Sequence, residues 1–145
     1  LVPPMSAAAV QATRLPDWQL RLAHLVEIRR DQPFVWGERD CATWAADVVQ
    51  AVTGCDPAAD VRQTYGTALQ ALALSQRMQG LTRVCRERLG PRVRTSLAQP
   101  GDIGLAREGG LPMLVACVGA AWMGQGPHGL AMVRPDAVRV AWRCC

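Results

Sequence analysis

The sequence predicts an α+β fold in which N-terminal helices pack on a C-terminal antiparallel β-sheet. Apolar residues recur at helical spacing in the first part of the chain, whereas short apolar runs between Gly and Pro turns follow Pro100-Gly101. Helices followed by strands are typical of α+β domains. The 145 residues fit one domain, and no internal repeat or interdomain linker divides them. We therefore expect one domain over residues 14–143, with residues 1–13 as an N-terminal extension.

The first predicted helix begins near Pro16 and ends before Pro33. Pro16 suits the first turn of a helix, and Asp17 favours its positive end. The residues at helical spacing are Trp18, Leu22, Leu25, Val26 and Arg29. His24 lies off this stripe, so we expect it to face solvent.

The second predicted helix has the most regular pattern in the chain. Asp40 is the expected N-cap, because its carboxylate can accept hydrogen bonds from the first turn. Thr53-Gly54 ends the run, as a glycine C-cap would. The stripe between these ends consists of Cys41, Trp44, Ala45, Val48, Val49 and Val52.

Two further helices and five strands complete the expected order. An Ala- and Leu-rich helix is expected over residues 66–78, and Gly80 separates it from a shorter helix that contains Leu81, Val84, Cys85 and Leu89. The predicted strands are DIGLA (102–106), MLVACVG (113–119), AAWMG (120–124), GLAMV (129–133) and VRVAW (138–142).

Targeting and membrane segments are not predicted. LVPPMSAAAV lacks the basic region and the long apolar core of a signal peptide. We interpret Met5 as the native start and Leu1–Pro4 as the remainder of an expression tag. No stretch approaches the roughly 18 apolar residues of a membrane span. We expect the protein to be cytoplasmic when it is made.

The positive charge does not predict a nucleic-acid partner. All 16 basic residues are arginine, the net charge is +4, and the arginines are spread along the chain. The densest stretch, RVCRERLGPRVR at residues 83–94, has no interleaved aromatic residues. It is typical of a solvated helix face followed by a loop.

The six cysteines predict free thiols rather than a metal site or a disulfide framework. They are isolated, apart from the adjacent Cys144 and Cys145, and no C-x-x-C or Cys/His ligand spacing occurs. We therefore expect no bound metal and no cofactor.

Cys41 admits two interpretations from the residues alone. A thiolate in the first turn of a helix would face unpaired N–H groups, which lower a cysteine pKa and can bind an oxyanion. Gly37 would let the backbone approach a substrate, and Trp36 could wall the cleft. The alternative is a small buried residue on the stripe of Trp44, with Asp40 serving only as an N-cap.

A family resemblance bears on this choice. WGERDCATWAADVV at residues 36–49 resembles the W-G-x-x-D-C-x-x-F segment of NlpC-type cysteine peptidases, which are papain-like cell-wall hydrolases, and especially a prophage-encoded branch found near tail genes. Three further stretches fit that branch: TGCDPAADVRQTYGT, PGDIGLA and the terminal VAWR. The likeness extends from Arg14 to Arg143 and implies a papain-like NlpC-type fold.

The resemblance also implies catalytic roles, one of which this sequence does not fill. Such enzymes use a cysteine nucleophile, a histidine base that opens the second strand of the sheet and a polar residue on the next strand. Cys41 matches the nucleophile, with its own backbone N–H in the oxyanion hole. Met113 stands where the histidine is expected, and the third position falls near Met123-Gly124, yet a thioether cannot act as a general base. His128 is the remaining candidate base, and a solvent-exposed turn histidine is the alternative.

Two functions from different classes follow. The first is a cysteine hydrolase that cleaves a peptidoglycan amide during tail-mediated DNA entry, with Cys41 as nucleophile and His128 as base. The second is a catalytically inactive homologue that acts in a phage tail tip or in tail assembly and binds a tail protein or a peptidoglycan fragment. Trp36, Gly37 and Asp40 would contribute to the binding site in either case. A third alternative is an α+β domain unrelated to peptidases.

Overall fold

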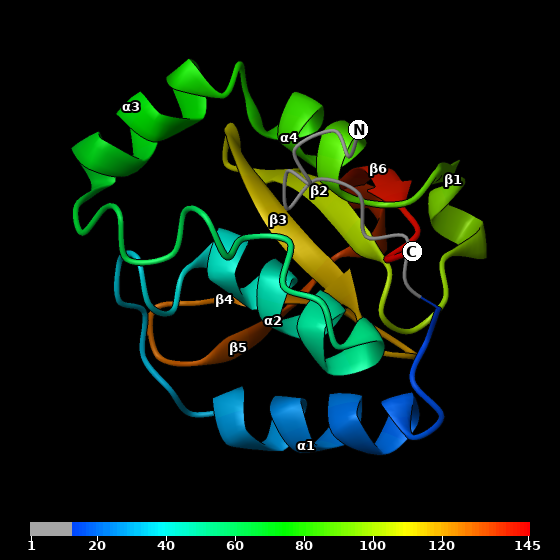
Figure 1. Cartoon of the computed structure of the whole chain (residues 1–145). Coiled ribbons are helices and arrows are strands. Elements are labelled where there is room, and N and C mark those ends of the chain that lie inside the picture. Colours follow the sequence, from blue (N-terminus) through cyan, green and yellow to red (C-terminus); the bar gives the residue numbers. More distant parts are fainter. Residues whose placement is uncertain (1–12) are drawn as a thin grey trace, which may run out of the picture.

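The computed structural model describes residues 13–145 and confirms an α+β fold (Figure 1). The expected tag residues Leu1–Pro4 and the expected start at Met5 lie outside the described residues. The α-helices precede the main strands, as the order of sequence patterns predicts. They are α1 (Trp18–Arg29), α2 (Cys41–Thr53), α3 (Ala68–Arg77) and α4 (Leu81–Arg88).

The strands form one antiparallel sheet in the order β1-β6-β2-β3-β4-β5. Its strands are β1 (Arg92–Val93), β2 (Ile103–Glu108), β3 (Leu111–Cys117), β4 (Trp122–Gln125), β5 (Leu130–Val133) and β6 (Val138–Trp142). The five predicted strands are therefore all present, with ends that differ by a few residues. The short edge strand β1 is not predicted, because its sequence carries no alternating apolar pattern.

Helix α2 is central to the fold, and its predicted ends are confirmed. Asp40 accepts a hydrogen bond from the Thr43 N–H at 2.9 Å, and the Asp40 N–H donates to Thr43 Oγ1 at 2.8 Å, which completes a capping box. Gly54 ends the helix in the left-handed conformation, with φ of 80°. All stripe residues except Cys41 are buried. This burial anchors α2 between α1 and the sheet.

The sheet is buried on both faces. One apolar cluster joins α1, α2 and α4 to the sheet through side chains such as Trp44, Ile103 and Leu114. A second cluster includes Val115, Trp122 and other apolar side chains of β2 to β6. Consecutive residues of β3 thus belong to different clusters, because side chains alternate across a strand. This alternation decides which residues of β3 can face α2.

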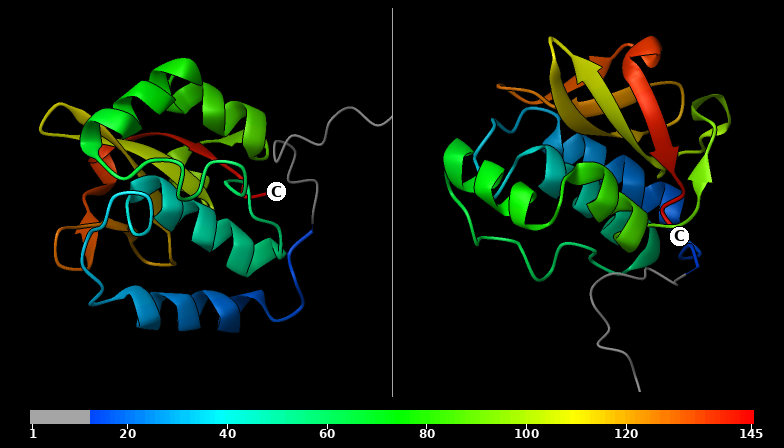
Figure 2. Two further views of the ribbon diagram at one scale, coloured as in Figure 1. Left: turned by 60° about the vertical axis from the view of Figure 1, so that its left-hand side comes forward. Right: turned by 90° about the horizontal axis from the view of Figure 1, so that it is seen from above.

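Helix α3 is attached to the rest of the molecule more weakly than the other helices. Thr67 caps it through a hydrogen bond from the Gln70 N–H, so the helix begins two residues later than the predicted residue 66. None of its residues is buried. Positive φ angles at Gln79 and Gly80 turn the chain from α3 into α4. In Figure 2, α3 and α4 lie together on one side of the molecule, while α1 lies on another.

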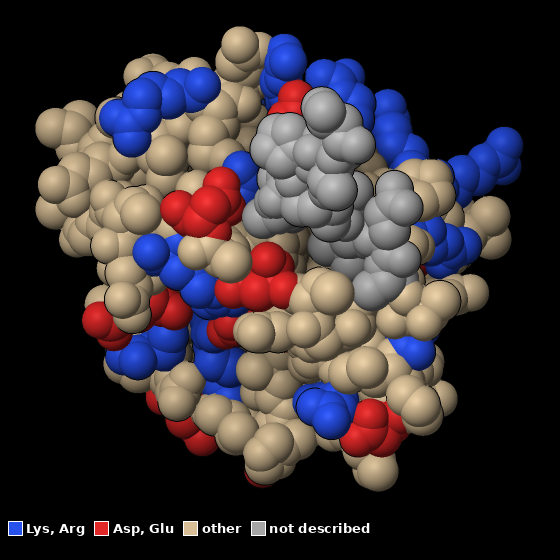
Figure 3. Space-filling model, viewed as in Figure 1, with Lys and Arg blue, Asp and Glu red and all other residues tan. Residues whose placement is uncertain are grey.

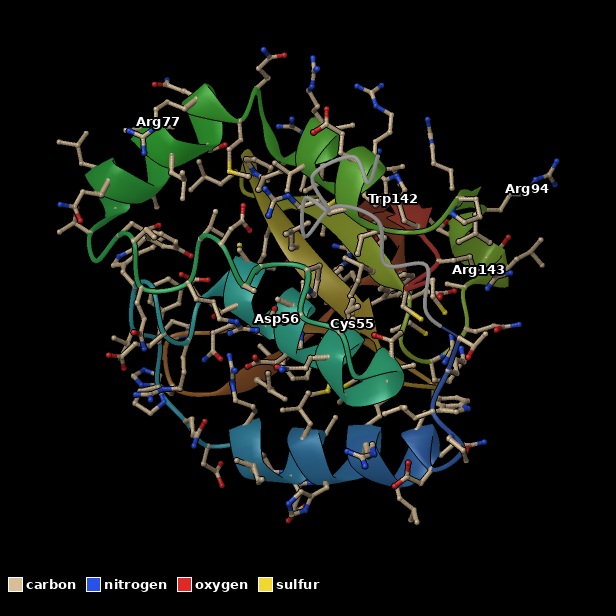
Figure 4. All side chains as sticks on the ribbon, in the orientation of Figure 1. Cys55, Asp56, Arg77, Arg94, Trp142 and Arg143 are labelled. Atoms are coloured by element: carbon tan, nitrogen blue, oxygen red, sulfur yellow. The ribbon has the colours of Figure 1, made fainter. Side chains whose placement is uncertain are left out.

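The described surface shows dispersed charge. On the face in Figure 3, arginine side chains occur at several separate places, with acidic side chains among them. Arg94 and Arg77 point outward from different elements (Figure 4). Within residues 13–145, none of the helices has the length and apolar character needed to cross a membrane.

Candidate functional site

Cys41 lies at one side of an apolar cavity of about 350 Å³. The first turn of α2, the connection between α2 and α3, both of the following helices and strands β2 and β3 contribute to its walls. Trp36, Tyr65, Cys85 and Leu114 also line it. The predicted site residues Trp36, Asp40 and Cys41 therefore share one cavity.

The carboxylate of Asp40 organises the loop before Cys41. The side chain is 2% exposed and accepts hydrogen bonds from the Gly37 N–H at 2.9 Å, the Thr43 N–H at 2.9 Å and the Tyr65 hydroxyl at 2.6 Å. Burial and the neighbouring carboxylate raise the pKa of Tyr65, so its hydroxyl remains a donor. Asp40 thus joins the cap of α2 to the chain 25 residues further on.

Gly37 and Trp36 have distinct structural roles. Gly37 has φ of 81°, and a Cβ atom there would lie 2.1 Å from the Tyr65 carbonyl oxygen. The close approach that Gly37 permits is therefore to the chain's own backbone, whereas the sequence suggested approach to a substrate. Trp36 is 38% exposed, and its ring meets that of Phe34 edge to face at 4.7 Å. It forms part of the cavity wall, as expected.

The electrostatic surroundings of Cys41 favour the neutral thiol. Burial raises the pKa of Cys41, and the negative charge of Asp40 raises it further. Backbone N–H groups, first that of Leu114 and then those of Ala42 and Cys41 itself, act in the opposite direction but have the smaller effect. Desolvation therefore outweighs the positive end of α2, and the thiol is protonated at neutral pH.

The two histidines lie away from the Cys41 cavity. His24 is exposed on α1, as predicted from its position off the apolar stripe. His128 is exposed in the turn between β4 and β5, and this turn packs on the end of α1 through the hydrogen bond from the Leu130 N–H to the Arg30 carbonyl. Neither histidine lines the cavity. Here the structure does not bring the candidate base to the candidate nucleophile.

The register of β3 places Met113 on the opposite face of the sheet from α2. Met113 packs with Val115 in the second cluster, and its Cε atom lies 3.2 Å from where a Gly124 Cβ would be. Pro112 and Leu114 line the cavity instead. The β3 residues that line the cavity are thus apolar, and Met113 packs away from it. Met123, at the expected orienting position, packs on the first cluster.

Tyr65 and Cys85 are site residues that sequence reasoning missed. Tyr65 is the only tyrosine, and its hydroxyl can recognise Asp40 only after the intervening chain has folded. Cys85 is 3% exposed, and burial raises its pKa to about 12. The sequence signal for Cys85 as a wall residue was its position on the apolar stripe of the predicted short helix.

The described residues offer no evident metal site. Within residues 13–145, His, Cys, Asp and Glu side chains form no group of three or more that is arranged to hold a metal ion. All six cysteines are free thiols.

Comparison with known proteins gives one family. Residues 13–144 match the family described as "Domain of unknown function (DUF6950)". Among curated proteins, none matches the chain.

Proposed function

Since the chain belongs to the DUF6950 family, whose description assigns no activity, we propose a function from the site: a binding protein without catalytic activity, descended from NlpC-type cysteine peptidases. The observation that carries this proposal is that Cys41 lies in a cavity whose wall is apolar. Leu114 and Pro112 of β3 form part of this wall, and neither histidine lines the cavity.

The chemistry of amide hydrolysis explains why this wall matters. A cysteine hydrolase needs a base to take the thiol proton and an acid to protonate the leaving amine. Asp40 is the nearest acidic residue in sequence, but its oxygens hold the α2 cap and the Tyr65 hydroxyl. Its charge also raises the pKa of Cys41, which makes thiolate formation less favourable.

The wider context of the proposal comes from the sequence resemblance and the order of elements. A cysteine at the head of a central helix that packs on an antiparallel sheet supports a papain-like NlpC-type fold. The likeness to a prophage-encoded branch supports a role at the tail tip or in tail assembly. In this proposal the protein binds a tail protein or a peptidoglycan fragment, and Cys41 is a wall residue of the apolar cavity rather than a nucleophile.

Thiol reactivity provides the direct test. We expect iodoacetamide at pH 7.5 to modify the exposed Cys55 at least tenfold faster than Cys41, because Cys41 is desolvated and protonated. Cys55 follows the C-terminal end of α2 and serves as the internal reference (Figure 4). Peptide mapping by mass spectrometry over time measures both rates. Faster modification of Cys41 than of Cys55 would contradict the proposal.

Phage infectivity separates binding from hydrolysis. Deletion of the gene from the prophage should abolish or reduce infective particles, whereas Cys41→Ala should retain infectivity, as should the control Cys55→Ala. If Cys41→Ala behaves like the deletion while its purified protein keeps the thermal stability of the wild type, the hydrolase becomes the better description.

A further inference from the structure

Helix α3 presents an apolar stripe to the cavity. Ala68, Ala71, Leu72 and Ser75 line the cavity at helical spacing, and Leu74 and the C-cap Met78 line it as well. Since α3 has no buried residue, this stripe gains little from the rest of the protein. Helix α3 is therefore amphipathic, and its apolar face borders the cavity.

Apolar side chains continue from the cavity to the molecular surface. Leu111 is 76% exposed, Leu72 is 55% exposed and Trp36 is 38% exposed, and all three line the cavity. In Figure 3 a basic side chain lies over α3, where Figure 4 labels Arg77, and the surface around it is uncharged. A ligand can thus enter between these exposed apolar side chains.

The charged side chains of the cavity, Asp40 and Arg88, are already engaged, and Ser75 adds one hydroxyl to its wall. The Asp40 oxygens have three donors, and Arg88 is paired with both oxygens of Asp60 and with the Pro57 carbonyl. Within residues 13–145, the buried side-chain nitrogens without a partner are Arg29 Nε and Trp142 Nε1, and neither residue lines the cavity. The thiols of Cys41 and Cys85 are neutral and behave as apolar wall atoms.

These observations exclude some ligands from the interior of the cavity. A peptide backbone or a charged stem-peptide group would lose its hydration there without gaining partners, which is unfavourable. A folded helix is too wide for a cavity of about 350 Å³, a volume that falls in the range of small-molecule sites. A flexible hydrocarbon satisfies both limits.

We propose that the cavity between α3, α4 and β3 binds a single aliphatic chain of a small amphiphile, with the polar head of the amphiphile in solvent near Leu111 and Leu72. This inference rests on the proposed non-catalytic function and concerns the interior of the cavity, so a tail protein or a peptidoglycan fragment would bind outside it. The chain fills the space beneath α3 and buries its apolar stripe, so ligand binding also fixes α3 on the molecule.

A chain-length series tests this assignment on the full protein. Decanoate should displace the fluorescent probe N-phenyl-1-naphthylamine with a dissociation constant on the order of 10 μM. Each methylene removed should weaken binding by about fourfold, which is the value for burial of one CH₂. N-acetyl-D-alanyl-D-alanine should not displace the probe. Probe displacement by this dipeptide without displacement by decanoate would overturn the aliphatic assignment.

Two tryptophan variants on α3 localise the ligand. Ala71→Trp places an indole in the cavity and should weaken decanoate binding at least tenfold. Leu69→Trp changes the same helix at a residue that is 76% exposed and does not line the cavity, so it should stay within about twofold of the wild type. Melting curves without ligand check that both variants fold. Equal decanoate binding by the wild type and Ala71→Trp would refute the location.

Vesicle flotation identifies the source of the chain. Phosphatidylcholine vesicles that retain the wild type but not Ala71→Trp would assign the chain to a membrane lipid, and decanoate binding without flotation would assign it to a free amphiphile. Both results support the aliphatic site. Absence of binding in both assays overturns it, whereas failure of the proposed function would show separately as rapid Cys41 modification.

Discussion

At the scale of a single residue, Asp40 shows how one buried carboxylate can organise a whole loop. Its carboxylate caps α2, fixes the Gly37 turn and accepts the Tyr65 hydroxyl. Each of these contacts stabilises the loop that presents Cys41. None of them requires a reactive thiol, so the cap accounts for Asp40 beside Cys41 without any role in catalysis.

Buried thiols should make the stability of this protein sensitive to alkaline pH. Burial raises the pKa of Cys85 to about 12 and also raises that of Cys41. An unfolded thiol ionises near pH 8.5, so above that pH the unfolded state binds fewer protons than the folded state. Stability is therefore fully present below about pH 8.5 and falls as the pH rises toward the folded pKa.

Denaturation at several pH values measures this effect. From pH 8.5 to pH 10, Cys85 alone should reduce the free energy of unfolding by about 2 kcal/mol. The chain has no lysine, so lysine titration does not mask the thiols. Cys85→Ala should flatten the pH profile, whereas Cys55→Ala at an exposed position should not. Identical profiles for Cys85→Ala and the wild type would refute the assignment.

At the scale of elements, the docking of the β4–β5 turn on α1 depends on one glycine. Gly129 has φ of 152°, and a Cβ atom there would lie 2.1 Å from the Arg30 carbonyl oxygen. That oxygen also accepts the Leu130 N–H at 3.0 Å. Gly129→Ala should therefore separate the turn from α1 and cost about 3 kcal/mol or more.

Gly119 provides a matched control for this prediction. Its φ of 119° is also positive, but a Cβ atom there would have no neighbour within 4 Å. Gly119→Ala should cost only about 1 kcal/mol, the expense of the backbone conformation alone. Chemical denaturation measures the free energy of unfolding of both variants and so separates the steric clash from the conformational strain. Equal losses of this free energy in the two variants would contradict a specific contact with Arg30.

At the scale of the whole molecule, Asp102 joins segments from both ends of the chain. This residue of the PGD turn is fully buried and accepts hydrogen bonds from Arg14, the Gln99 N–H, Arg143 and the Cys144 N–H. Of the two arginines, Arg143, labelled in Figure 4, makes the shorter hydrogen bond to Asp102, at 2.7 Å. Asp102 therefore stabilises the closure of the fold at the end opposite the β4–β5 turn.

Removal of this carboxylate should destabilise the whole domain. Asp102→Ala leaves two arginines and two backbone N–H groups without their acceptor, and a loss of about 3–5 kcal/mol is expected. Asp136→Ala, which breaks only the exposed pair with Arg134, should cost less than about 1 kcal/mol. Urea denaturation compares the two variants. A similar loss in both would show that the buried network contributes little.

Local patterns predicted much of the fold, because the forces behind them act between residues that are near in sequence. The capping box spans three residues and the α2 stripe recurs with the helical period, so both can be found from sequence. Apolar runs between turns likewise predict the strands.

The candidate site depended on information that is not local. Strand β3 is apolar on both faces, so its sequence carries no alternation that tells Met113 from Leu114. The Tyr65–Asp40 hydrogen bond and the cavity beneath α3 arise only when distant segments meet.

The sequence by itself thus determined the element order, the capped central helix and the position of Cys41 at its head. Tertiary structure decided which side chains surround that thiol: Leu114 rather than Met113 faces the cavity, and His128 lies in a turn on α1. The physical reason is that helix periodicity and capping are encoded within a few residues. The pairing register of a sheet buried on both faces is fixed only by packing of the whole molecule.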